Sequence, residues 1–120
     1  MKISELMKII SEGESDRIEF KRKITRDSAK DITAFLNTSG GIILYGIDDD
    51  GSLFGVENEP KLDRMLESIE PKPFNLVDTR KIEIEGRTIF VSNIKKSQRM
   101  HMYRKTVYMR IGTMNKPLSV

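Results

Sequence analysis

The chain has 120 residues and a formal net charge of +3, with 38% hydrophobic and 32% charged residues. It contains no cysteine, which excludes a disulfide framework, a thiolate metal site and a cysteine nucleophile, and its one histidine, His101, excludes a multi-histidine zinc site. No apolar run approaches the roughly 18–20 residues of a membrane span, and the first ten residues lack a signal peptide's apolar core, so we expect a cytoplasmic protein with no membrane partner.

The first half of the chain shows the spacing of two helices and two strands. Apolar residues recur at helical spacing in two segments, and a third segment alternates as a strand does. The fourth, GIILYGI, is apolar almost throughout, as expected of a central strand covered on both faces. The predicted elements are a helix over Ile3–Ser11, a strand over Arg17–Lys21, a helix from Asp27 or Ser28 to about Asn37, and a strand over Gly41–Ile47.

The second half indicates hairpins and one further helix. The predicted elements are a turn at Asp48–Gly51 with Ser52–Val56 pairing back, a helix over Lys61–Glu70, a hairpin of Val77–Glu85 with Arg87–Ile94, two short strands or one bent strand over His101–Ile111, and an irregular tail over Gly112–Val120. This order predicts an α+β fold with about three helices and a mixed, mostly antiparallel sheet. The length fits a single domain over residues 1–120.

Charge is distributed unevenly along the chain. Residues 1–85 contain all 18 acidic residues and 13 basic residues, a net charge of −5. Residues 86–120 contain the other eight basic residues and no acidic residue, a net charge of +8. This asymmetry indicates a surface that binds a polyanion. The alternative is that folding interleaves the two segments and cancels the field.

Glu14 and Glu19 form the first candidate site. Five residues apart, they converge only if Glu14 lies in the turn before the strand, which Gly13 allows. Together they could then bind Mg²⁺ or Mn²⁺, and Lys21, on the same strand face, could hold a phosphate. The alternative is an exposed strand face on which Arg17, Glu19 and Lys21 pair with charges of a neighbouring strand.

Asp48 or Asp49 could add a third carboxylate at the end of the central strand. A hairpin turn is the alternative explanation of this acidic run. The segment NTSGG at residues 37–41 lacks the pattern of a phosphate-binding Walker loop, and we interpret it as a tight turn with structural glycines.

The basic end of the chain supplies candidate contacts to nucleic-acid phosphates, which are Arg99, Arg104, Lys105, Arg110 and Lys116. Tyr103 and Tyr108 lie among them and could stack on exposed bases. Tyrosines in short strands serve packing as often, so phosphate contact is the stronger expectation.

Three segments, GESDRIEFKR, DITAFLNTSGGIILYGIDDDGSLFGVE and YMRIGTMNKPLSV, resemble the Schlafen-type AlbA-like domain family over roughly residues 12–120. The resemblance implies an α+β fold that binds nucleic acid. Some family members cut transfer or ribosomal RNA at a three-carboxylate, metal-dependent site. By resemblance, its two glutamates match Glu14 and Glu19, its third acid matches Asp48 or Asp49, and its lysine matches Lys21.

The resulting expectation is a domain that binds RNA or DNA. With Mg²⁺ or Mn²⁺ at its carboxylates it would be an endoribonuclease acting on structured RNA such as transfer RNA. A single copy would then need a homodimer to form the two-lobed cleft that the resemblance implies. Two alternatives stay open: a non-catalytic DNA-binding or transcription-regulatory module, and a nucleotide (ATP)-binding or interaction domain.

Overall fold

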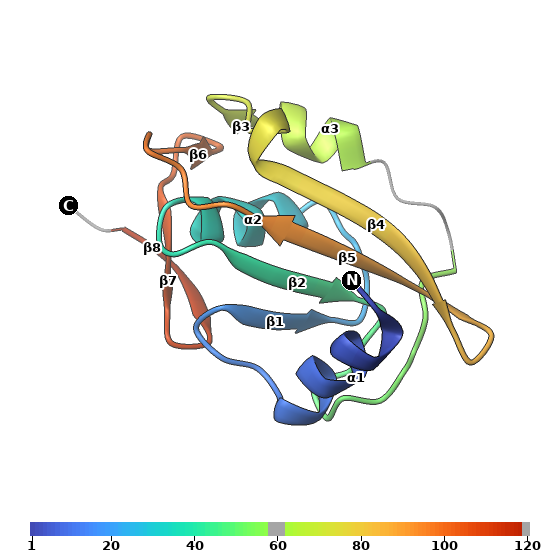
Figure 1. Cartoon of the computed structure of the whole chain (residues 1–120). Coiled ribbons are helices and arrows are strands. Elements are labelled where there is room, and N and C mark those ends of the chain that lie inside the picture. Colours follow the sequence, from blue (N-terminus) through green and yellow to red (C-terminus); the bar gives the residue numbers. More distant parts are fainter. Residues whose placement is uncertain (58–61, 119–120) are drawn as a thin grey trace.

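A four-stranded sheet in the order β1-β2-β5-β4 forms the centre of the protein (Figure 1). The computed structural model describes residues 1–57 and 62–118. β1 (Ile18–Lys21) pairs in parallel with β2 (Gly41–Tyr45), whereas β5 (Arg87–Ile94) runs antiparallel to both β2 and β4 (Val77–Ile84). The predicted α+β fold with a mixed, mostly antiparallel sheet is confirmed.

Helices cover both faces of this sheet. α1 (Ile3–Glu12) packs on one face, and α2 (Ser28–Leu36) with α3 (Leu62–Glu67) packs on the other (Figure 1). The first two helices lie close to their predicted bounds, because their apolar stripes face the sheet. No helix within the described ranges is long and apolar enough to cross a membrane.

The central strand β2 is buried between two hydrophobic cores. Leu44 belongs to the core beneath α1, whereas Ile43 and Tyr45 belong to the core beneath α2 and α3. Successive side chains of a strand point to opposite faces, so a strand between two cores is apolar at nearly every position. The predicted central strand is therefore confirmed, although its regular pairing ends at Tyr45.

Two small sheets complete the fold beside α2. β3 (Ile69–Glu70) pairs with β6 (Met102–Tyr103), and β7 (Tyr108–Ile111) pairs with β8 (Met114–Pro117). A single 3₁₀ turn (Phe74–Leu76) precedes β4. Both β6 and the β7–β8 hairpin contact α2, so the C-terminal segment packs against the first half of the chain.

The third predicted helix is shorter than its pattern indicated. α3 ends at Glu67, and Ile69–Glu70 form β3 instead; the predicted first residue, Lys61, lies outside the described residues. The Ser68 hydroxyl donates to the carbonyl of Met65 (2.5 Å), which competes with continuation of the helix. Ile69 is then fully buried as a strand residue, a position that its apolar character suits equally well.

The tail, predicted to be irregular, forms β8. Gly112 adopts a left-handed φ of 59° at the turn, and the chain pairs back on β7. β8 has no buried apolar side chain, so its sequence lacks the alternation that reveals a strand. The last two predicted tail residues lie outside the described part of the chain.

The two predicted hairpins differ in how far they pair. β4 and β5 pair along their full length around Glu85–Gly86, as predicted. Ser52–Val56 returns only through a bridge between Ile47 and Leu53 and a few backbone bonds, and it forms no regular strand.

Gly40 and Gly41 are structural, as predicted. Both have positive φ angles (69° and 153°). A Cβ on Gly40 would lie 2.5 Å from the carbonyl oxygen of Ile94, and one on Gly41 would clash with the carbonyl of Arg17. The glycine pair thus lets the chain turn closely between α2 and β2, which supports the interpretation as a tight turn rather than a phosphate loop.

Candidate functional site

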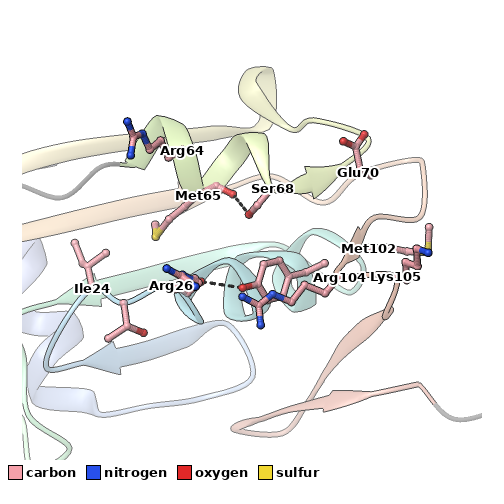
Figure 2. A pocket seen from close by; sticks show the side chains of 11 residues that line it. Ile24, Arg26, Arg64, Met65, Ser68, Glu70, Met102, Arg104 and Lys105 are labelled. Carbon is pink, nitrogen blue, oxygen red and sulfur yellow. Dashed lines mark hydrogen bonds between the residues drawn. The ribbon is translucent and has the colours of Figure 1, made fainter.

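A pocket of about 760 Å³ lies between the β1–α2 loop, α3 and the β6 turn (Figure 2). Four cationic side chains from these elements surround it, and we call it the basic pocket: Arg26, Arg64, Arg104 and Lys105. One acid, Glu70, also lines it and pairs with Lys72 at 3.1 Å. All four cations are exposed, and none forms an ion pair with any other described residue.

The walls of the basic pocket are largely apolar. Met65 and Tyr103 are buried members of the core, and Met102 is exposed to 40% of its surface. The Tyr103 hydroxyl donates to the carbonyl of Arg26 (3.4 Å), and the Arg104 guanidinium lies 5.3 Å from the centre of the Tyr103 ring. Apolar walls with a few convergent polar groups are the usual composition of a ligand site.

Arg104 and Lys105 occupy a turn that ordinarily excludes such residues. Tyr103 and Thr106 exchange backbone bonds of 2.9 and 3.0 Å, and the two residues between them have φ angles of 49° and 62°. Such turns favour Asn-Gly, because side chains are strained at positive φ by about 1–3 kcal/mol each. The turn places two adjacent cations at the pocket rim, and its strain is a reason to test these two residues for a function.

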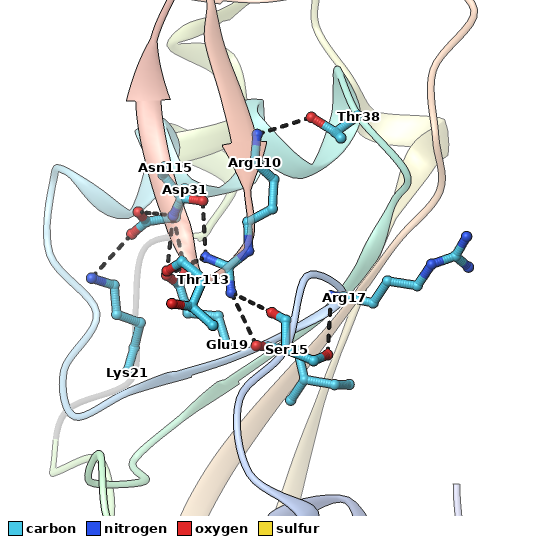
Figure 3. Close-up of polar contacts among 10 residues, drawn as sticks. Ser15, Arg17, Glu19, Lys21, Asp31, Thr38, Arg110, Thr113 and Asn115 are labelled. Atoms are coloured by element: carbon cyan, nitrogen blue, oxygen red, sulfur yellow. Dashed lines mark hydrogen bonds and ion pairs between the residues drawn. The ribbon is translucent and has the colours of Figure 1, made fainter.

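Arg110, the fourth predicted phosphate contact in chain order, is instead buried. Its side chain is 1% exposed, and Nη1 donates to Oε1 of Glu19 at 3.0 Å (Figure 3). Nη2 donates to the carbonyls of Ser15 (2.8 Å) and Ile18 (3.0 Å). The prediction that Arg110 contacts nucleic acid is thus corrected: β7 packs against α2, and the Arg110 side chain is buried where it reaches β1.

Three further side chains complete this cluster of polar groups, and one of them, Lys21, is partly exposed. The Asn115 amide on β8 donates to both Glu19 oxygens (3.1 and 3.2 Å) and to Asp31 on α2 (2.6 Å). Lys21 Nζ lies 3.4 Å from the second Asp31 oxygen. We call Glu19, Lys21, Asp31, Arg110 and Asn115 the buried polar cluster; it joins β1, α2 and the β7–β8 hairpin (Figure 3).

The pKa of the Glu19 carboxyl is raised above its ordinary value. Burial is the largest cause, and the neighbouring Asp31 carboxylate raises the pKa further. The cations Arg110 and Lys21 and the Asn115 amide lower it, with Arg110 contributing most among these. Arg110 is therefore the main group that offsets the cost of burying the Glu19 carboxylate.

Asn37 and Thr38 of the NTSGG segment hold the C-terminal strands in position. The Asn37 amide donates to the carbonyls of His101 (2.9 Å) and Tyr108 (3.0 Å), and its oxygen accepts the His101 backbone N–H (2.8 Å). Thr38 Oγ1 accepts the Arg110 backbone N–H at 2.9 Å. These bonds fix β7 over α2 and so place Arg110 above Glu19.

The predicted carboxylates do not meet around a common centre within the described residues. Glu14 is half-buried, Asp48 lies 3.7 Å from Arg22 on the surface, and Asp49 is exposed. Residues 1–57 and 62–118 contain no group of three histidine or acidic side chains arranged to hold a metal ion. The Glu19 carboxylate here accepts three hydrogen bonds, one from Arg110 and two from the Asn115 amide. The metal roles of Glu14, Glu19, Asp48 and Asp49 stay predictions.

Several residues of these sites carried no signal in the sequence. Arg26 and Arg64 lie in residues 1–85, the segment with net negative charge, and only folding brings them to the basic C-terminal segment. Asp31 and Asn115 are separated by 84 positions, and no local spacing relates them.

Two solved structures of other proteins share the fold of this chain. The chain aligns with the DIP2311 protein from Corynebacterium diphtheriae at 15% identity and a TM-score of 0.70, covering 97% of this chain and 26% of that one. It also aligns with the N-terminal domain of a protein from Nitrosomonas europaea, provisionally described as an ATP-dependent DNA helicase RecG-related protein, at 17% identity and a TM-score of 0.55, covering 100% and 95% of the two chains. At these identities the likeness shows the fold alone.

A comparison with curated proteins finds no match. The profile of the family described as Schlafen, AlbA_2 matches residues 14–119, almost the entire chain. The matched region includes the Glu19 strand, the NTSGG turn and the strand that carries Arg110. The chain therefore belongs to the Schlafen AlbA_2 family.

Proposed function

We propose that the protein binds nucleic acid through the cations of its acid-free C-terminal segment. The observation that carries this proposal is exposure: of the eight basic residues between 86 and 118, all but Arg110 are exposed. Folding adds Arg26 and Arg64 to the same surface at the basic pocket. Membership of the family and the helicase-related description of the Nitrosomonas europaea protein support the proposal.

Non-catalytic binding is the form of this function that the geometry supports best. Cleavage would require Glu14, Glu19 and Asp48 or Asp49 to converge, and Glu19 would have to leave Arg110 and Asn115. Metal-dependent endoribonuclease activity, and the homodimer that would form its cleft, therefore remain a conditional extension of the proposal. The chemistry of phosphate contact requires only exposed cations, which the described surface provides.

Binding should fall steeply with salt, because each neutralised phosphate releases a counterion. Four to six contacts from Arg99, Lys116 and the basic pocket predict a slope of about −3 to −5 in a plot of log K against log salt concentration. Removing two contacts in Arg99→Ala/Lys116→Ala should reduce the slope by about 1.5–2. Fluorescence anisotropy with labelled RNA and DNA oligonucleotides across a salt series measures both.

The matched control removes the same charge elsewhere. Lys8 on α1 and Lys81 on β4 are exposed and lie outside the C-terminal segment. Lys8→Ala/Lys81→Ala should leave the slope within error of the wild-type value. An equal loss in both double variants, or no binding at low salt, would remove the proposal.

A separate experiment tests metal-dependent cleavage of RNA. Transfer RNA is incubated with Mn²⁺ and the wild-type protein or Glu14→Gln, a substitution at a half-buried position with no structural bond among the described residues. Cleavage by the wild type that Glu14→Gln abolishes would support the extension. Equal cleavage by both proteins, or none by either, would rule it out and leave the binding proposal intact.

A further inference from the structure

The basic pocket differs from an ordinary patch of surface cations in having an apolar interior. A rigid duplex presents phosphates but keeps its base faces stacked inside, so it gains nothing from the apolar walls. An unpaired nucleotide offers a phosphate for the rim and a flat apolar base for the interior. A volume of about 760 Å³ lies within the range of small-molecule sites and accommodates one nucleotide.

The rim and walls are arranged for both parts of a nucleotide. Arg104 and Lys105, held in their strained turn, present adjacent cations across the pocket from Arg64 on α3. The exposed Met102 offers apolar surface that a base would cover. The Glu70 carboxylate on the rim can accept hydrogen bonds from the amino groups of a base.

We infer that the basic pocket accepts an unpaired base of a single-stranded or bulged nucleic acid, with the adjoining phosphates held by Arg104, Lys105, Arg26 and Arg64. This inference rests on the proposed function, and it names the form of nucleic acid that the protein selects. An acidic peptide would satisfy the cations but would leave the apolar interior unfilled.

The test fills the pocket without changing its charge. Thr25 is an exposed lining residue whose side chain has no hydrogen bond within the described residues, so Thr25→Trp places a bulky ring in the interior. The matched control is Ser11→Trp, at the end of α1 on the opposite face of the sheet. The probes are a ten-nucleotide single strand with a central 2-aminopurine, made as RNA and as DNA, and a plain duplex of equal length.

We expect Thr25→Trp to weaken single-strand binding about tenfold or more, the value of stacking one base, and to change duplex binding less than twofold. Binding of the single strand should also shift the 2-aminopurine fluorescence in the wild type and in Ser11→Trp, and should not do so in Thr25→Trp. Comparing the affinities of the RNA and DNA probes shows whether the protein distinguishes ribose from deoxyribose. If Thr25→Trp melts early, Ser68→Trp fills the pocket from the turn between α3 and β3 instead.

The outcomes separate this inference from the proposed function. Salt-dependent binding of single strand and duplex alike, unaffected by the pocket-filling variants, would overturn the inference and leave the proposed function standing. No binding of either probe would remove both. Tighter binding of free ATP or of polyglutamate than of the single strand would overturn the inference by assigning the pocket another ligand.

Discussion

Arg110→Met is expected to lower the free energy of unfolding by about 3–5 kcal/mol, because it leaves the buried Glu19 carboxylate without its main cation. The loss should be smaller at low pH. The folded-state pKa of Glu19 is already raised and would rise further in this variant, so its carboxylate destabilises the fold above that pKa and is neutralised below it. Urea denaturation at pH 7 and pH 5 measures both effects.

Two companion variants make this result interpretable. Arg99→Met removes an exposed arginine and should change stability by no more than about 0.5 kcal/mol. Glu19→Gln combined with Arg110→Met should recover part of the loss, since the unpaired charge is gone. A loss below about 1 kcal/mol in Arg110→Met would show that the buried polar cluster does not hold the C-terminal hairpin in place.

Arg104→Asn/Lys105→Gly is expected to stabilise the protein and weaken nucleic-acid binding at the same time. Relief of the strain at these two left-handed residues, less the greater unfolded-state entropy of the new glycine, should add about 1–2 kcal/mol to the free energy of unfolding. Loss of two rim cations should reduce affinity about tenfold and flatten the salt slope by about 1.5–2. Urea denaturation and anisotropy titrations on the same samples measure the two changes.

The chain provides a matched control for this prediction. Glu85 and Gly86 form a similar turn between β4 and β5, with φ angles of 51° and 75°. Glu85→Asn relieves the same kind of strain away from the basic pocket, so it should stabilise the protein without weakening binding. If Arg104→Asn/Lys105→Gly binds as tightly as Glu85→Asn, the strained turn has no role in binding.

The fold was largely predictable from the sequence, and the misses have local causes. The two-faced apolar run of β2 and the Glu85–Gly86 hairpin leave clear periodic patterns. Ile69–Glu70 continues the helical pattern of α3 but pairs with β6, because strand or helix suits a single buried isoleucine equally. β8 buries no apolar side chain, and a strand without buried apolar residues leaves no hydrophobic alternation to detect.

The sequence predicted the kinds of residues in the candidate sites but not which of them meet, because these residues come together only through tertiary packing. The charge asymmetry indicated a polyanion surface, and Arg104 and Lys105 were among its predicted contacts. Sequence charge does not encode burial, however, so Arg110 looked the same as its exposed neighbours. Its acid, Glu19, lies 91 positions away, and no spacing rule relates the two.

We expect nucleic acid to bind at the basic pocket, and amide chemical-shift mapping with a single-stranded ten-nucleotide probe measures where it binds. The largest shifts should fall at residues 24–26, 64–68 and 102–105, with the amides of α1 unchanged. Shifts confined to α1 or to the Asp48–Gly51 turn would contradict this expectation.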